Sequence, residues 1–237
     1  EINPKFYESF NNLGSAYYRL GLNEEALKNY KHAIKLNPNF ADAFNNLGNL
    51  LTVLDRFEEA EINFQKAIEI DPYFAEAYNN LGSILERLAK INDAVNCFKK
   101  AITLRPNFAA AHNNYGNILG GKLGRLNDAV ESFERAIQIN PNLVEALNNL
   151  GVTLSELSRL DEAIDAYEKA ISINPDYAEA FNNLGVALNK LGKHEEAVKS
   201  YEKALKVEPE YADAYNNLGV VLKKLGRTNE AGRLEKD

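Results

Sequence analysis

The sequence predicts an all-α solenoid in which one helix-turn-helix unit is repeated along the whole chain. The dipeptide Asn-Asn occurs seven times, and successive copies are 34, 34, 34, 35, 34 and 34 residues apart. A period in this range is typical of stacked supersecondary units. Within each period, apolar residues recur at helical spacing, and a proline closes each of the first six periods. The copies are Asn11-Asn12, Asn45-Asn46, Asn79-Asn80, Asn113-Asn114, Asn148-Asn149, Asn182-Asn183 and Asn216-Asn217.

Residues 41–74 illustrate one repeat. The first predicted helix, over residues 41–51, carries its apolar residues at helical spacing: Phe44, Leu47, Leu50 and Leu51. The second, over residues 57–68, has Ala60, Phe64, Ala67 and Ile68 on one stripe. Gly48 faces the small alanines of the second helix, so we expect the two backbones to approach closely. Pro72 cannot continue the second helix and marks its end.

These residues resemble a tetratricopeptide repeat (TPR) array. In the first repeat the characteristic residues are Phe10, Leu13-Gly14, Tyr17, Ala26, Tyr30, Ala33 and Pro38. The resemblance implies a right-handed superhelix whose first helices line the concave side, within a single domain of six complete repeats and one partial repeat. The expected repeats are residues 7–40, 41–74, 75–108, 109–143, 144–177, 178–211 and 212–237.

Composition restricts the class of partner. The formal charge is −7, so neither a nucleic-acid surface nor an anionic membrane is the expected partner. No run is long and apolar enough for a transmembrane helix, and the first residues show no signal peptide. Cys97 is the single cysteine, which fits a cytoplasmic or other intracellular location. Because residues 1–4 resemble the end of a repeat, the chain is expected to be a fragment of a longer protein.

The recurring asparagine pairs predict a polar surface on the first helices. With Ala41 as position 1 of its repeat, they occupy positions 5 and 6, on a stripe beside the core stripe. Asparagine is a mediocre helix former, so its recurrence needs an explanation. A similar stripe lies in the TPR superhelices of O-GlcNAc transferases and SPINDLY-type glycosyltransferases, where a concave asparagine ladder binds protein substrates. The resemblance implies peptide contact through the second asparagine of each pair: Asn12, Asn46, Asn80, Asn114, Asn149, Asn183 and Asn217.

The alternative is that the amides bond to a neighbouring helix and set the stacking of repeats, a role that the first asparagine of each pair fits best. Both roles are compatible, since an amide offers one acceptor and two donor hydrogens.

Two further positions border this stripe. Position 2 is acidic in six repeats, at Glu8, Asp42, Glu76, Glu145, Glu179 and Asp213. The helix dipole explains acids in a first turn, and their charge favours a neutral or basic ligand. The same acidic stripe argues against the carboxylate clamp of chaperone-binding TPRs, because that clamp needs lysine and arginine on the first helices. Position 9 changes from Ser15, Asn49, Ser83 and Asn117 to valine at Val152, Val186 and Val220, so the groove becomes more apolar towards the C-terminus. Either the two halves prefer different ligand segments, or the change is drift at a tolerant surface position.

Repeat four departs from the pattern. Its 35-residue step places one extra residue around Gly120-Gly121, and His112 and Tyr115 replace the usual residues. A widened helical turn acting as a hinge is one hypothesis, and neutral drift is the other.

No catalytic or metal-binding motif is present, and no cofactor is expected. His32, His112 and His194 occupy different repeat positions, and the acid pairs that begin second helices fit dipole and capping effects. Three hypotheses remain: a peptide-binding scaffold, the substrate-recognition arm of a glycosyltransferase, and a scaffold that self-associates end to end. Glu235, Lys236 and Asp237 fit either a polar cap or a truncation.

Overall fold

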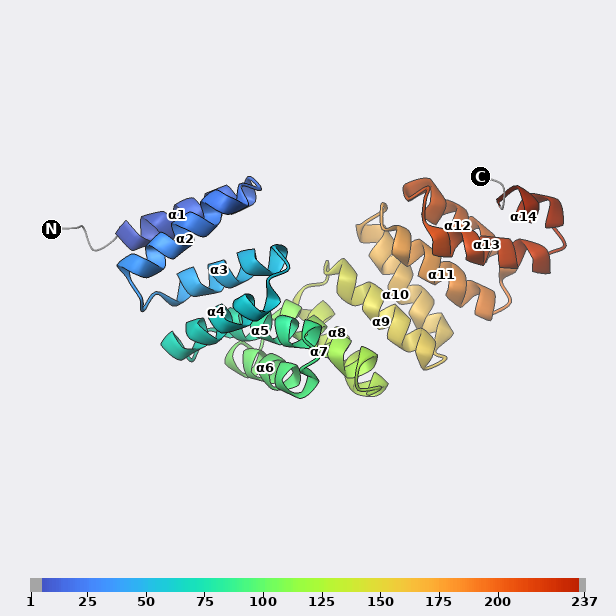
Figure 1. The fold of residues 1–237 in the computed structure, drawn as a ribbon. Coiled ribbons are helices and arrows are strands. Elements are labelled where there is room, and N and C mark those ends of the chain that lie inside the picture. The colour runs from blue at the N-terminus through green and yellow to red at the C-terminus, as the bar shows by residue number, and fades with distance from the viewer. Residues whose placement is uncertain (1–5, 235–237) are drawn as a thin grey trace. The chain divides into compact units, whose positions relative to one another are not determined.

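A computed structural model describes residues 6–234, so the predicted polar cap at residues 235–237 lies outside the described residues. These residues form fourteen α-helices and no strand (Figure 1). The helices are α1 (Phe6–Arg19), α2 (Asn23–Leu36), α3 (Ala41–Val53), α4 (Phe57–Ile70), α5 (Ala75–Arg87), α6 (Ile91–Leu104), α7 (Ala109–Gly121), α8 (Leu126–Ile139), α9 (Val144–Glu156), α10 (Leu160–Ile173), α11 (Ala178–Lys190), α12 (His194–Val207), α13 (Ala212–Lys224) and α14 (Thr228–Leu234). The predicted all-α solenoid of helix pairs is confirmed.

The chain divides into two compact units. Unit 1 is Glu1–Ile118 and unit 2 is Leu119–Asp237, so the division falls inside α7 of repeat four. Both units contain the same motif, a first helix and a second helix packed side by side and followed by the next pair.

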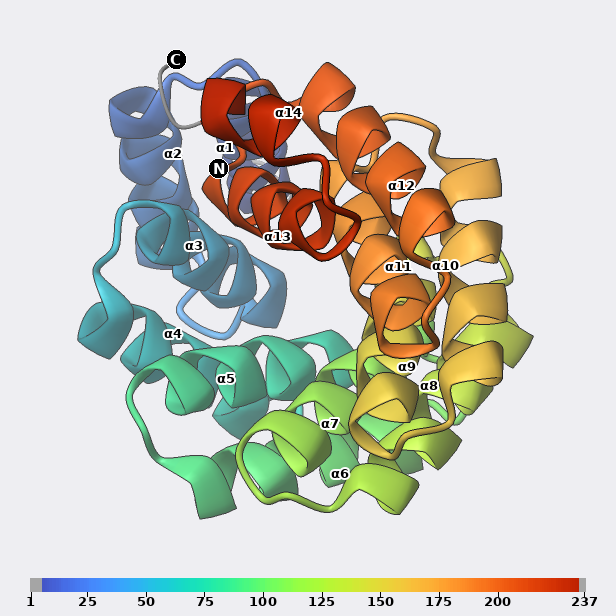
Figure 2. The same ribbon diagram turned by 90° about the vertical axis from the view of Figure 1, so that its right-hand side faces the viewer.

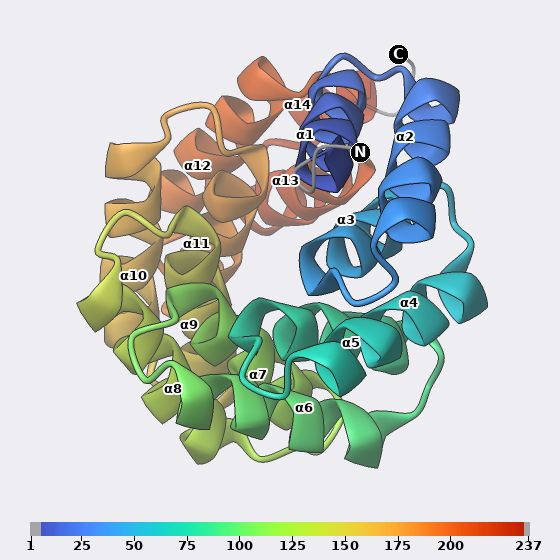
Figure 3. The same cartoon turned by 90° about the vertical axis from the view of Figure 1, so that its left-hand side faces the viewer.

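The helices of each unit form two layers. In unit 1 the first helices α1, α3 and α5 contact one another in sequence, and the second helices pack against first helices (Figure 3). In unit 2 the first helices α9, α11 and α13 do the same (Figure 2). Direct contact between successive first helices means that side chains at equal repeat positions become neighbours.

Aromatic rings fill the space between paired helices. Phe64 of α4 is 1% exposed and lies over Gly48 of α3, where an added Cβ atom would be 2.6 Å from the ring. The same contact joins Gly151 to Tyr167, at 2.5 Å. The small residue that was expected to bring two backbones together therefore accommodates a ring. The predicted stripe of α4 is buried at Ala60, Phe64 and Ala67.

The extra residue of repeat four lengthens a turn. Helix α7 has 13 residues, as do α3 and α9, and it is assigned as α-helix throughout. In the neighbouring repeat, Arg159 N–H closes the turn on Leu154 C=O at 2.9 Å. In repeat four, Arg125 N–H reaches Leu119 C=O at 2.8 Å, which closes a ring one residue larger. The extra residue therefore lies in the turn that follows α7, which is wider than the equivalent turn of the neighbouring repeat.

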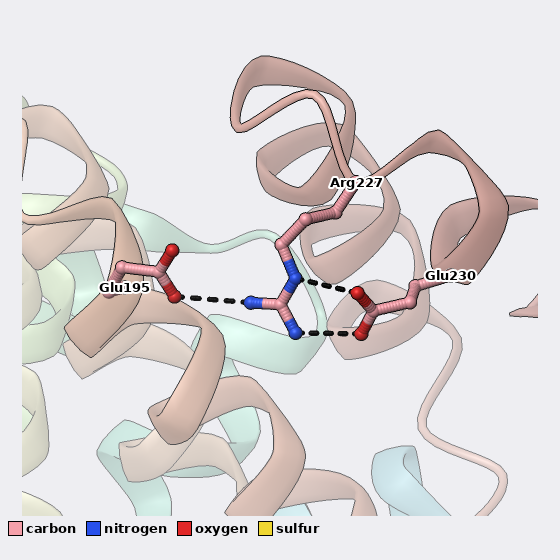
Figure 4. A network of polar contacts seen from close by, with 3 residues as sticks. All are labelled: Glu195, Arg227 and Glu230. Atoms are coloured by element: carbon pink, nitrogen blue, oxygen red, sulfur yellow. Dashed lines mark hydrogen bonds and ion pairs between the residues drawn. The ribbon is translucent and has the colours of Figure 1, made fainter.

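Arginines in the turns tie helices together at the surface. Arg227, between α13 and α14, donates from Nε and Nη2 to the two carboxylate oxygens of Glu230, at 2.8 and 2.7 Å (Figure 4). Its Nη1 also donates to Glu195 of α12 at 3.1 Å, so one guanidinium links α14 to the preceding repeat.

We predict that Gly151→Ala destabilises the protein by about 1–3 kcal/mol, the usual cost of an overpacked core, because the new methyl group meets the Tyr167 ring. The matched control is Gly121→Ala, where no atom lies within 4 Å. Since alanine is the better helix former, this control is expected to gain about 0.5–1 kcal/mol. Urea unfolding measures both, and a Gly151→Ala protein as stable as the wild type would contradict the packing described.

A second prediction concerns alkaline pH. Burial raises the pKa of Tyr167 and of Tyr201 to about 12, whereas repeats two and three have Phe64 and Phe98 at the equivalent positions. Burial also raises the pKa of Tyr30, the equivalent residue of repeat one. The buried phenols stay neutral while unfolded phenols ionise, so stability is complete below pH 10 and is lost as the pH rises towards 12. Tyr167→Phe with Tyr201→Phe should reduce that loss in thermal melts between pH 9 and pH 11.5. An unchanged pH profile would contradict the assignment.

Candidate functional site

The asparagine pairs lie on the layer of first helices, and their two members differ in exposure. The first asparagine is buried in six repeats, with exposures of 6, 7, 7, 9, 1 and 5% at Asn11, Asn45, Asn79, Asn113, Asn148 and Asn182. The second asparagine is exposed at Asn12 and half-buried in the other six repeats. The seven predicted contact residues therefore lie on the accessible side of the stripe.

Hydrogen bonds join the pairs of adjacent repeats into a ladder. In each case Nδ2 of the second asparagine donates to Oδ1 of the first asparagine in the preceding repeat. In unit 1 the rungs are Asn46–Asn11 at 3.0 Å, Asn80–Asn45 at 3.1 Å and Asn114–Asn79 at 3.0 Å. In unit 2 they are Asn183–Asn148 at 3.1 Å and Asn217–Asn182 at 2.9 Å. The amide-to-helix bond weighed above as the structural alternative is therefore present.

The ends of the array show what buries the first asparagine. Asn216 has the same repeat position as Asn182 but is exposed, because no further first helix follows α13 in the described residues. Asn12 is likewise exposed, since no described first helix precedes α1. Each rung is thus a contact between repeats, and stacking itself creates it.

Position 9 participates in the ladder, a role that the sequence did not reveal. Asn80 donates from Nδ2 to Oδ1 of Asn49 at 3.0 Å, in addition to its rung with Asn45. Asn114 similarly reaches the Ser83 hydroxyl at 3.5 Å. The change of position 9 to valine was visible in the sequence, but its link to the neighbouring amide required the structure.

The acids of position 2 occupy the first turns of their helices, as predicted, and α7 has none. Their partners differ between units. Glu76 pairs with Arg105 at 2.6 Å in unit 1. In unit 2, Glu179 accepts a hydrogen bond from Nδ2 of Asn148 at 3.0 Å. Burial, followed by the charges of Glu179 and Glu145, raises the pKa of Tyr177 to about 12.

Burial and ion pairs explain the shifted pKa values of other ionisable groups. The acid pairs begin second helices as predicted, but the preceding residues make no side-chain cap there. Instead, the Arg56 guanidinium lowers the pKa of Glu59, which keeps this carboxyl ionised. Burial raises the pKa of Cys97 to about 11, so its thiol stays protonated. Within residues 6–234, no group of His, Cys, Asp and Glu side chains is arranged to hold a metal ion.

Hollows in unit 2 lie away from the ladder. One is lined by Leu147, Leu150 and Leu154 of α9 together with residues of α8 and α10, and none of its lining residues belongs to the asparagine stripe. The ladder itself is an open row of side chains along successive first helices. An open row of amide donors and acceptors suits a long ligand better than a small molecule.

None of the helices in the described part of the chain combines the length and apolar character of a membrane span. The fold and the ladder together define a class, the helical-repeat proteins that present a continuous side-chain surface.

Family comparisons make the class specific. One TPR-repeat model matches residues 14–54, 121–158, 154–192 and 187–226. Two tetratricopeptide-repeat models match residues 41–74 and 75–108, and residues 97–131. The chain belongs to the tetratricopeptide repeat family.

Solved structures agree with this assignment. YrrB, described as a TPR protein with an unusual peptide-binding site, is 28% identical with a TM-score of 0.63, over 79% of this chain and 96% of its own. MamA is 30% identical with a TM-score of 0.62, over 70% of this chain and 96% of its own. A chain of the Cut9–Hcn1 complex shares the fold alone, at 17% identity and a TM-score of 0.82, over 93% of this chain and 44% of its own. No curated protein matches the chain.

We predict that Asn148→Ala destabilises the protein by about 1–3 kcal/mol, because it deletes the acceptor of Asn183 and the donor to Glu179 at a position that is 1% exposed. Asn216→Ala, the same substitution at the exposed end of the ladder, should change the free energy of unfolding by less than about 0.5 kcal/mol. Urea unfolding of the two variants tests the ladder as a structural element. Equal effects would contradict it.

Proposed function

We propose that this protein is a non-catalytic interaction scaffold that binds an extended peptide segment along its first helices, through the second asparagine of each pair. The observation that carries the proposal is the row of half-buried amides, held in register by bonds to the preceding repeat. An amide fixed in this way keeps its carbonyl oxygen, and at some rungs a second N–H, directed at the surface. It can then pair with the N–H and C=O groups of an extended chain.

The preorganised ladder supports this function energetically. Fixing a free asparagine side chain on binding costs conformational entropy, and a side chain already held by a rung avoids that cost. The peptide-binding site described for YrrB, a TPR protein 28% identical to this chain, adds support from a relative. The acids of position 2 lie one helical turn from the amides, so we propose a ligand that is neutral or basic.

A second candidate is the substrate-recognition arm of a glycosyltransferase like O-GlcNAc transferase. The asparagine stripe itself favours it, because the resemblance noted above rests on that stripe. Finding the coding sequence of a glycosyltransferase domain downstream in the gene would support this candidate. A gene without such a domain would leave the simple scaffold.

Self-association is a third candidate, favoured by apolar side chains on α1 that are open to solvent. Phe6 and Leu13 are 51% and 43% exposed. A second copy stacked on this helix would cover them. Light scattering over a dilution series should then show a mass that falls with dilution, and a constant monomer mass would eliminate this candidate.

Direct binding tests the main proposal. Octapeptides with capped ends and alternating valine and lysine should bind the wild-type protein in isothermal titration calorimetry, whereas alternating valine and glutamate should bind more weakly. Asn183→Ala combined with Asn217→Ala should lower the affinity about tenfold or more, since each lost hydrogen bond contributes about 0.5–1.5 kcal/mol. Asn127→Ala, an exposed asparagine at the start of α8, is the control and should bind like the wild type.

Methylating alternate backbone nitrogens of the peptide provides a second measurement, which leaves the protein unchanged. The methylated peptide should bind more weakly, because it cannot donate to the asparagine oxygens. If neither the backbone methylation nor the double substitution weakens binding, the ladder is not the peptide site.

A further inference from the structure

We propose that the residue at position 9 decides which rungs of the ladder accept a ligand, so that Asn183 and Asn217 of unit 2 hold the peptide while Asn80 and Asn114 of unit 1 serve stacking. This inference rests on the proposed function and adds the place of binding and the chemistry of the ligand. Its basis is a count of amide hydrogens, because each asparagine has only two to donate.

In unit 1, position 9 consumes the second hydrogen. Nδ2 of Asn80 donates both to Asn45 at 3.1 Å and to Asn49 at 3.0 Å. Its Oδ1 also accepts a long bond from Asn79, at 3.5 Å. Nδ2 of Asn114 is shared between Asn79 at 3.0 Å and the Ser83 hydroxyl at 3.5 Å. A ligand that accepted from these Nδ2 groups would have to displace bonds that already exist, and would gain little.

In unit 2, position 9 has no acceptor. The residue that corresponds to Asn49 is Val152 for the Asn183 rung and Val186 for the Asn217 rung, and both valines are half-buried. Asn183 and Asn217 each bond to the preceding repeat, at 3.1 and 2.9 Å. Valine cannot accept from their second N–H, which therefore has no acceptor at position 9.

The first rung has no bond to position 9. Ser15 occupies this position, but its hydroxyl donates to the Asn11 carbonyl at 3.1 Å and accepts from Tyr30 at 3.2 Å. Asn46 accordingly bonds to Asn11 alone among the described residues.

The side chains around the open rungs define the ligand. Along α11, Glu179, Asn183 and Val186 follow one another at spacings of four and three residues, so they form one stripe across the helix. The stripe offers a carboxylate, an amide and a methyl surface in that order. It fits an extended segment that presents backbone carbonyls to Asn183 and Asn217, a small apolar side chain to Val186 and a lysine or arginine to Glu179.

Exchanging position 9 between the units tests the inference. Val152→Asn with Val186→Asn should saturate the open rungs and lower the affinity for the valine–lysine octapeptide about tenfold, the value of one hydrogen bond of about 1.4 kcal/mol. Thermal melts check that each variant is folded.

The control is Val220→Asn, which adds the same polar group at position 9 of the last repeat, where no asparagine rung follows in the described residues. It should bind within about twofold of the wild type. The reciprocal variant, Asn49→Val with Ser83→Val, frees the hydrogens of Asn80 and Asn114 and should add a second binding event or raise the affinity.

The two proposals fail differently. If the wild-type protein binds none of the peptides, the proposed function is wrong. If the wild type binds and the variants at positions 152 and 186 bind equally well, peptide binding stands and control by position 9 is overturned. A Val220→Asn variant as weak as these variants would also overturn it, because polarity alone would then explain the loss.

Discussion

The hydrogen bond between asparagine amides of adjacent repeats is the interaction on which the rest of this structure depends. It forms only when two first helices stack with equal repeat positions side by side. The acceptor, such as Asn148 at 1% exposure, is then enclosed by the next repeat. A buried amide without a partner costs more than its hydrogen bond contributes, so a slip in stacking register is penalised at every rung. Both the 34-residue period and the asparagine pair therefore follow from one requirement, that each rung finds its partner in the adjacent repeat.

The constraint also explains how a polar residue can serve two purposes. A rung uses one N–H of the second asparagine and leaves the other N–H for the position-9 residue or for a ligand. The array therefore places amides at regular intervals, and their side chains are already ordered before a ligand binds. Whether a given rung is open depends on its neighbour at position 9, where Val152 and Val186 also pack against the core of unit 2.

Much of the fold and of the asparagine stripe could be predicted from the sequence, because a pattern that is ambiguous in one repeat is clear when it recurs in the others. The helix pairs, the buried stripe of Ala60 and Phe64, and the acids in first turns all follow from spacing and residue type. What escaped prediction depends on contacts between repeats. The donor–acceptor direction of the rungs, the role of Asn49 and the ring over Gly48 each need a neighbour placed in three dimensions. The glycines of repeat four mark the region of its extra residue, and turn closure by Arg125 places that residue after the helix.

Side-chain amide exchange, followed by nuclear magnetic resonance on ¹⁵N-labelled protein without ligand, tests the central claim most directly. It reports on the two Nδ2 hydrogens of each asparagine separately. The account predicts slow exchange of both hydrogens at Asn80, and of one hydrogen only at Asn183 and Asn217. Equal protection of both hydrogens at all three residues would contradict it, and so would rapid exchange of all of them.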